Sequence, residues 1–317
     1  MTFKYRALEE AIVSAVERGC RGKDVAVATS GGLDSGLIAL LANEYADSVT
    51  MYTCGTSNAF DVINGQDLAE RSGIPWVRAA LTKGTIEDDV RGLIRATGTS
   101  DPFTVSYELQ LYCVCRTADA EVVLTGQGAD EYFMGCAKYV GCSRQDYEVL
   151  VRGGKDRLRD VSIPCERTIA AHFGKSLVYP YMDQQVQSII EAIDPEELIP
   201  RDMDSRKQVL KDIAADLGYG FLAERKKKSS QYGSGTTDLI RGLAKSRNMM
   251  YNQYIAVLYD EAMGEIPQKG RGAVINARID SVVKAQAEEV LRKRGLTPSE
   301  AIEGFYRDII AEDRGSE

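Results

Sequence analysis

A short polar loop near the N-terminus combines groups that bind an anion with one that binds a cation. The loop, SGGLDS at 30–35, follows an apolar run at 25–28 that predicts a buried strand and precedes apolar-spaced residues at 36–42 that predict a helix. Its glycines let a ligand approach the backbone, and free N–H groups at a helix start attract anions. Because a carboxylate repels an anion unless a cation lies between them, Asp34 indicates a phosphate bound together with Mg²⁺. The residues predicted to bind the phosphates are Ser30, Gly31, Gly32, Asp34 and Ser35.

Two other loops place carboxylates after apolar runs that predict strands. TGQGADE at 125–131 carries Asp130 and Glu131, and LVYPYMD at 177–183 ends at Asp183. Ligands of an open parallel sheet bind beyond the carboxyl ends of its strands, so we expect the three loops to converge on a triphosphate and Mg²⁺. Asp is also common in turns and caps, and such a role for Asp183 is an equal alternative.

The elements that position these loops alternate between strands and helices in the first half of the chain. Strands are predicted at 25–28, 48–55, 75–81 and within 120–131, and helices at 4–18, 64–73, 87–98 and 102–118. This alternation predicts an α/β fold with a parallel sheet flanked by helices. After about residue 145 helical periodicity dominates. We expect one domain over 1–317, with an α/β nucleotide-binding part at 1–190 and a mainly helical part at 191–317 packed on it.

The last two helical segments, near 275–295 and 299–314, carry apolar stripes. Thr297 and Glu300 match a capping box that opens the second of them. We expect the stripes to pack on their own chain. Burial against a partner subunit is the alternative, and it is compatible with a homo-oligomer.

Composition excludes several classes of site. The chain has 317 residues and a net charge of −8, which argues against nucleic acid as a partner. Seven cysteines without a CxxC pair argue against a disulfide framework and favour a reducing compartment. We expect the close pair Cys113 and Cys115 to be buried. His172 is the only histidine, which disfavours Ser–His chemistry, and no targeting or membrane-spanning segment is evident, so a cytoplasmic location is expected.

Four motifs occur in an order that resembles a known family. SGGLDS, TGQGADEYFMG, VYPYMD and RKKKSSQYGSGTT are similar to motifs of the synthetase domain of asparagine synthetases and the related β-lactam synthetases, which are PP-loop ATP pyrophosphatases. The resemblance spans about 5–245 and implies an adenine nucleotide alpha hydrolase-like fold. It implies a ligase in which a substrate carboxylate attacks the α-phosphorus of ATP and pyrophosphate leaves. Ammonia or an amine then attacks the acyl-adenylate to give an amide and AMP.

The resemblance also assigns roles to individual residues. Asp34 and Asp130 match the Mg²⁺ ligands of the family, and Asp183 matches an aspartate near the pyrophosphate. Lys227 matches the lysine that stabilises charge on the phosphate and on the tetrahedral intermediate, although a basic run such as ERKKKSS would otherwise predict a solvated turn. The residues expected near the adenine are Met51, Tyr52, Thr53 and Gly126.

One position in the second motif departs from the family. Gln127 stands where asparagine-forming enzymes have Glu and β-lactam-forming enzymes have Tyr. A glutamine amide donates and accepts hydrogen bonds but does not titrate, so the catalytic base must be another group. Glu166 or a tyrosine near the site are the candidates.

The sequence leaves alternatives for the nitrogen donor and for the function of the chain. The chain begins Met1–Thr2 rather than with the nucleophilic Cys of glutamine-dependent relatives, so we expect the nitrogen to come from free ammonia, from an ammonia-supplying partner, or from an amine of the substrate. The resemblance implies aspartate as the default substrate among small carboxylic acids. A PP-loop enzyme that modifies tRNA and a non-catalytic nucleotide-binding protein are the competing functions.

Overall fold

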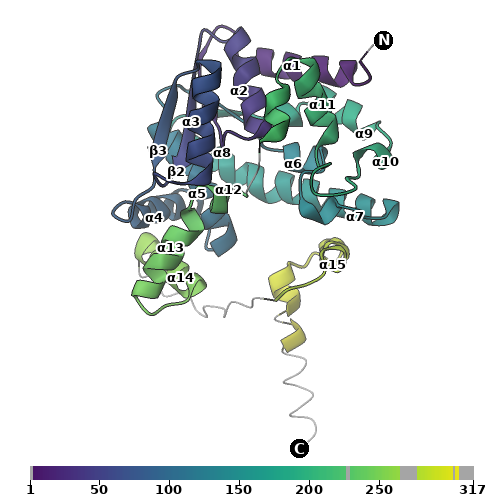
Figure 1. Cartoon of the computed structure of the whole chain (residues 1–317). Coiled ribbons are helices and arrows are strands. Elements are labelled where there is room, and N and C mark those ends of the chain that lie inside the picture. The colour runs from purple at the N-terminus through teal and green to yellow at the C-terminus, as the bar shows by residue number, and fades with distance from the viewer. Residues whose placement is uncertain (1–2, 226–228, 265–276, 303, 307–317) are drawn as a thin grey trace, which may run out of the picture.

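The predicted strands form a five-stranded parallel sheet in a computed structural model that describes residues 3–225, 229–264, 277–302 and 304–306. The strand order is β3-β2-β1-β4-β5 (Figure 1). The chain moves to one side of β1 for β2 and β3 and to the other side for β4 and β5, so the order reverses between β1 and β4. The α/β fold with a parallel sheet is thus confirmed. The strands are β1 Asp24–Ala28, β2 Ser48–Gly55, β3 Trp76–Ala80, β4 Val122–Thr125 and β5 Ser176–Val178.

Helices cover both faces of the sheet, because successive side chains of a buried strand point to opposite faces. In β1, Val25 and Val27 join a core with apolar residues of the first two helices, whereas Ala26 joins a second core with residues of α4 and α5. The helices are α1 Arg6–Cys20, α2 Leu33–Tyr45, α3 Phe60–Ser72, α4 Ile86–Thr97, α5 Pro102–Thr117, α6 Ala129–Tyr132, α7 Arg144–Arg157, α8 Ile163–His172, α9 Gln184–Glu191, α10 Pro195–Leu198, α11 Gln208–Asp216, α12 Ser230–Gly233, α13 Thr236–Ser246, α14 Tyr251–Met263 and α15 Ser281–Lys293. Short helical turns lie at Ala137–Tyr139, Leu158–Ser162, Pro180–Met182 and Gly220–Glu224.

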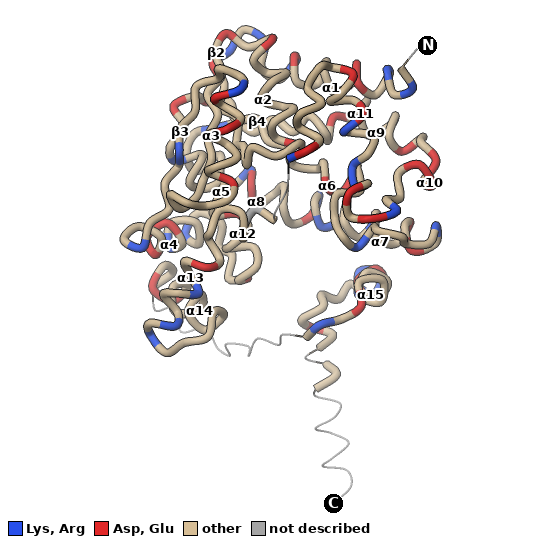
Figure 2. The backbone as a smooth tube through the Cα atoms, viewed as in Figure 1, with Lys and Arg blue, Asp and Glu red and all other residues tan. Residues whose placement is uncertain are grey.

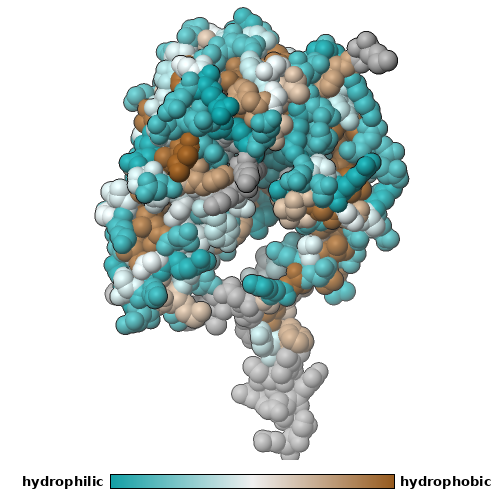
Figure 3. All heavy atoms as spheres, in the orientation of Figure 1, coloured by the Kyte–Doolittle hydropathy of each residue, from teal (hydrophilic) through white to brown (hydrophobic). Residues whose placement is uncertain are grey.

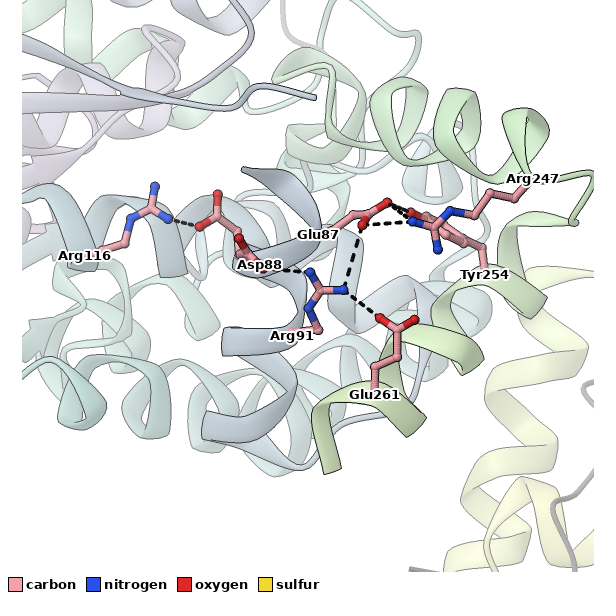
Figure 4. Close-up of polar contacts among 8 residues, drawn as sticks. Glu87, Asp88, Arg91, Arg116, Arg247, Tyr254 and Glu261 are labelled. Carbon is pink, nitrogen blue, oxygen red and sulfur yellow. Dashed lines mark hydrogen bonds and ion pairs between the residues drawn. The ribbon is translucent and has the colours of Figure 1, made fainter. Parts of the chain in front are cut away.

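Charged contacts join α14 and the end of α13 to α4, although these elements are far apart in the sequence (Figure 4). Arg91 contacts Glu261 at 2.6 Å and Asp88 at 2.7 Å. Glu87 accepts hydrogen bonds from Arg247 at 2.8 Å and from the Tyr254 hydroxyl. Beneath these contacts α14 buries Tyr254, Ile255 and Leu258 against α4 and α5, so this part of the helical half packs on the helices that cover one face of the sheet.

The structure also shows the state of the cysteines and the apolar character of the helices. All seven cysteines are free thiols, and Cys113 and Cys115 are buried as predicted. Among the helices that the structure describes, none is long and apolar enough to cross a membrane.

Candidate active site

The SGGLDS loop lies at the end of the central strand, where the strand order reverses. Gly31 adopts a φ of +70°, and a Cβ there would lie 2.3 Å from the backbone carbonyl carbon of Asn64, so only glycine fits. The Gly31 N–H donates to Thr29 Oγ1 at 3.0 Å, and the Ser30 N–H donates to Ser35 Oγ at 3.2 Å. These bonds curl the loop so that it leads directly into α2.

A pocket opens beyond the carboxyl ends of β1, β2 and β4. Ala28, the last residue of β1, is in register with Tyr52 of β2 and Thr125 of β4, which brings the three following loops together. Nine of the residues that the sequence predicts line this pocket: Ser30, Asp34, Ser35, Tyr52, Thr53, Gly126, Gln127, Asp130 and Glu166. Gly31, Gly32 and Met51 are buried but do not line the pocket, and Lys227 lies outside the described residues.

Lys207 bridges the two carboxylates that were predicted to bind Mg²⁺. Its Nζ lies 2.5 Å from Oδ2 of Asp34 and 2.7 Å from Oδ1 of Asp130, and the lysine is 6% exposed. The backbone makes this possible: Lys207 has a φ of +58° just before α11. A Cβ on Gly135 would lie 2.0 Å from the Asp130 carboxylate and 2.1 Å from Lys207 Cε, so glycine is required beside the pair. The two carboxylates therefore converge on one cation.

This donor set fits Mg²⁺ shared with phosphates. In the described part of the chain, no group of three or more His, Cys, Asp or Glu residues could hold a metal ion alone. Mg²⁺ usually takes one or two carboxylates and completes its shell with phosphate oxygens and water. Asp34 and Asp130 supply two carboxylates from separate loops around one positive charge, which matches that requirement.

Arg225 fastens the SGGLDS loop to α3. Its buried guanidinium donates to the carbonyl oxygens of Gly31 and Asn64 and pairs with Asp67 at 2.7 Å. The planar fork of arginine suits three such acceptors. Arg225 also directly precedes 226–228, the segment that contains Lys227.

In the YPYMD motif, the tyrosine rather than the aspartate contacts the SGGLDS loop. The buried Tyr181 hydroxyl donates to the backbone carbonyl of Asp34 at 2.9 Å and so supports the start of α2. Asp183 instead caps α9 by accepting from the Gln185 N–H at 3.0 Å, and it pairs with Arg18 at 2.6 Å. Asp183 does not line the described pocket, and its role near pyrophosphate stays a prediction.

On the other side of the pocket, Gln127 and Glu166 are hydrogen-bonded to each other. Gln127 Nε2 donates to Glu166 Oε1, and the Tyr107 hydroxyl donates to Gln127 Oε1 at 3.4 Å. Glu166 is 3% exposed, and burial raises its pKa to about 7, an effect that Tyr179 and Gln127 partly offset. Glu166 therefore titrates near neutrality at a site where a proton could be accepted.

Comparison with known proteins places part of the chain in a family. Residues 7–149 match the family model described as asparagine synthase. This part of the chain is an asparagine synthase-family domain. A protein named "Putative asparagine synthetase 1 (glutamine-hydrolyzing)" of Methanocaldococcus jannaschii is 30% identical over 280 residues, which cover 75% of this chain and 51% of that protein. The carboxyethyl-arginine beta-lactam-synthase of Streptomyces clavuligerus is 25% identical over 297 residues, covering 90% and 55%.

The comparisons give two further facts about the chain. The chain spans about half the length of the curated relatives that it matches. In addition, residues 272–314, far from the synthase match, fit a second family model described as RelB antitoxin.

The pocket wall also holds a buried glutamate that sequence reasoning missed. Glu108 of α5 lines the pocket beside Glu166 and is 3% exposed. Burial and the nearby charge of Glu166 raise the pKa of Glu108 well above its usual range, and Arg157 lowers it. Among the described residues that line the pocket there is no Lys, Arg or His. This wall therefore favours a cationic or proton-donating group over a second carboxylate.

Proposed function

We propose that the chain is an ATP-dependent ligase that adenylates a substrate carboxylate, releases pyrophosphate, and transfers the acyl group to ammonia or an amine. The observation that carries the proposal is the convergence of Asp34 and Asp130 on Lys207 Nζ beside the SGGLDS loop, in a pocket whose opposite wall holds Glu166. This arrangement provides cation-assisted phosphate chemistry and a base within one site. The asparagine synthase match over 7–149 supports the same reaction class.

The first step forms the acyl-adenylate. A carboxylate oxygen attacks the α-phosphorus of ATP, and the bond to the β-phosphate oxygen breaks with its electron pair on pyrophosphate. Asp34 and Asp130 would hold Mg²⁺, which supplies charge neutralisation of the phosphates when bound. Lys207 adds a fixed positive charge at the same place, and loop N–H groups at the start of α2 bind phosphate oxygens.

The second step forms the amide, and Glu166 is the base. The attacking nitrogen loses a proton to the Glu166 carboxylate, the nitrogen–carbon bond forms, and AMP leaves as the acyl–phosphate bond breaks. Gln127 orients Glu166 through its amide N–H, and Tyr107 in turn holds the amide oxygen of Gln127. Glu108 lies in the same wall, where burial and the charge of Glu166 favour its protonated form, so it offers the incoming amine a hydrogen-bonding group.

Pyrophosphate release from Mg-ATP tests this function. It is measured across a panel of small carboxylic acids headed by aspartate, with and without ammonium, together with AMP and the amide by mass spectrometry. Asp34→Ala should abolish release, whereas Asp47→Ala, an exposed aspartate at the far end of α2, should retain it. ATP binding without pyrophosphate release under every acid and amine would contradict the proposal and favour a non-catalytic nucleotide-binding protein.

A role in tRNA modification is less well supported. Figure 2 shows Lys and Arg scattered among acidic residues on the described tube rather than gathered on one face. RNA-binding proteins need a basic footprint for the phosphate backbone. RNA-stimulated pyrophosphate release would nevertheless favour that alternative in the same assay.

A further inference from the structure

Lys207 lies in a fixed position between the two carboxylates that the proposed function assigns to Mg²⁺. Its Nζ is 2.5 Å from Oδ2 of Asp34 and 2.7 Å from Oδ1 of Asp130. A lysine ammonium is a compact point charge with three donors, so a single group can serve both carboxylates at once. A cation that balances this pair is therefore part of the chain itself.

The Lys207 side chain has little room to move away from the pair. It is 6% exposed, and its Cε packs directly on Gly135, where an added Cβ would lie 2.1 Å from that atom. The residue before it, Arg206, donates from its guanidinium to the Gly135 carbonyl oxygen at 2.9 Å. The loop that carries the lysine is thus fastened to the same glycine that the lysine covers.

Helix α11, which begins directly after Lys207, anchors the lysine from the other side. Its residues Val209, Leu210 and Ile213 are buried and share a core with apolar residues of α1 and α2. Figure 3 shows a mainly hydrophilic surface in the upper right of the molecule, where Figure 1 places α11. The helix thus has one side in the core and the other toward solvent, and a movement that withdrew Lys207 would expose apolar residues to water.

The charges of these three groups determine when a metal ion can join them. Two carboxylates and one ammonium give a net charge of −1. Mg²⁺ alone would bring a divalent charge next to an ammonium that cannot withdraw, in a buried place where repulsion is only weakly screened. The phosphates of ATP remove this conflict, because their oxygens both complete the shell of Mg²⁺ and accept charge-assisted hydrogen bonds from a lysine.

We propose that Lys207 occupies the place of the metal ion until a nucleotide binds, so that Asp34 and Asp130 take up a divalent cation only together with nucleotide phosphates. The inference rests on the proposed function for the assignment of these carboxylates to a metal, and it adds the order of binding. With nucleotide present, Lys207 Nζ donates to phosphate oxygens, and the carboxylate oxygens that it releases become available to the cation.

Binding of Mn²⁺ to the full chain, followed by loss of the free-ion EPR signal, tests the proposal without catalysis. The unmodified chain should bind Mn²⁺ at this pair only when the α,β-methylene analogue of ATP, which cannot release pyrophosphate, is also present. Lys207→Met keeps an unbranched side chain but removes the charge. This variant should bind Mn²⁺ without nucleotide at least about tenfold more tightly than the unmodified chain, because the repulsion is gone.

Two controls locate the effect at the pair. Lys211→Met removes a lysine one turn further along α11, which contacts the carbonyl oxygen of Asp204 instead, and should bind Mn²⁺ like the unmodified chain. Adding Asp34→Ala to Lys207→Met should abolish the gained affinity. Circular dichroism shows whether each variant is folded, and the comparison of the unmodified chain with and without the analogue requires no variant at all.

Three results overturn the inference. They are tight Mn²⁺ binding by the unmodified chain without nucleotide that Asp34→Ala removes, a folded Lys207→Met variant that gains no affinity, and no Mn²⁺ binding even with saturating analogue. Failure of the ligase reaction looks different. If Mn²⁺ and the analogue bind together as expected but no acid gives pyrophosphate release from Mg-ATP, the order of binding is supported and only the proposed reaction is refuted.

Discussion

Replacing Glu166 by Gln removes a titrating group while keeping its shape. A glutamine oxygen can still accept the hydrogen bond that Gln127 Nε2 donates to Glu166 Oε1, so we expect the pocket to keep its form. Loss of a general base typically slows the proton-transfer step by about 10²- to 10⁴-fold. Amide formation in Glu166→Gln should therefore fall by this factor, whereas ATP affinity and acyl-adenylate formation should change little.

The pH dependence gives a second and independent signature of Glu166. Burial raises its pKa to about 7 from an ordinary value of 4.5, so the base is ionised only near and above neutrality. In the unmodified enzyme, amide formation should fall about tenfold per pH unit below about pH 7, as expected for a single ionisation. In Glu166→Gln this limb should disappear.

The raised pKa of Glu166 also determines how this residue changes the free energy of unfolding with pH. The folded state holds the Glu166 proton more tightly than the unfolded state, so the stability due to this group is present below pH 4.5 and is lost as pH rises through about 7. A rise from 4.5 to about 7 corresponds to at most about 3 kcal/mol. Urea unfolding at about pH 8 should therefore show Glu166→Gln to be more stable than the unmodified chain by up to about that amount.

Single-turnover experiments separate the two steps. Pyrophosphate release reports adenylation, and amide appearance reports nitrogen attack. Glu108→Gln is the matched control, because Glu108 is equally buried in the same wall but is not the residue to which Gln127 donates its amide hydrogen bond. The assignment fails if Glu166→Gln forms amide at the original rate with the original pH limb. It also fails if Glu108→Gln, and not Glu166→Gln, removes that limb.

Three further substitutions test the phosphate side of the site. Lys207→Met leaves two carboxylates facing each other, so the free energy of unfolding should fall by about 3 kcal/mol in Mg²⁺-free urea titrations and recover partly in millimolar Mg²⁺. Gly135→Ala forces a Cβ into that ion pair and should lower stability by about 1–3 kcal/mol and abolish pyrophosphate release, whereas Gly242→Ala, which meets open space, should not destabilise the chain. Arg225→Lys loses the planar fork that holds the phosphate loop, so KM for ATP should rise about tenfold with a smaller change in kcat. An unchanged KM would show that this fork does not position the loop.

The sheet and the phosphate loop were predictable from sequence because their signals are local. The run at 25–28, the glycines and the apolar spacing after them specify strand, loop and helix within eighteen residues, 25–42. The convergence of Asp34 with Asp130 was also predictable, since the loops that follow neighbouring parallel strands meet at one edge of a sheet.

The rest of the site depends on contacts that no local pattern encodes. Lys207 reaches Asp34 across 173 positions of sequence, from a residue with positive φ just before a helix. Its surroundings, SRKQVLKD, show only helical periodicity. Glu108 lies within a run that predicts a buried helix, and that prediction is correct for α5 but gives no sign that one side chain faces the pocket. Asp183 shows the converse, because its cap role was as compatible with the motif as a ligand role.

The replacement of glutamate by glutamine at position 127 has a physical consequence for the base. Two carboxyl groups in hydrogen-bond contact cannot both ionise near neutrality, so a glutamate at 127 would share one proton with Glu166. A glutamine there donates a hydrogen bond that lowers the pKa of Glu166, against the burial that raises it. With Glu108 in the same wall, a further carboxyl group at 127 would raise the pKa of Glu166 more, away from the range where it can deprotonate an amine. In the proposed reaction, Gln127 therefore keeps Glu166 available as a base, which is not the property of a decayed site.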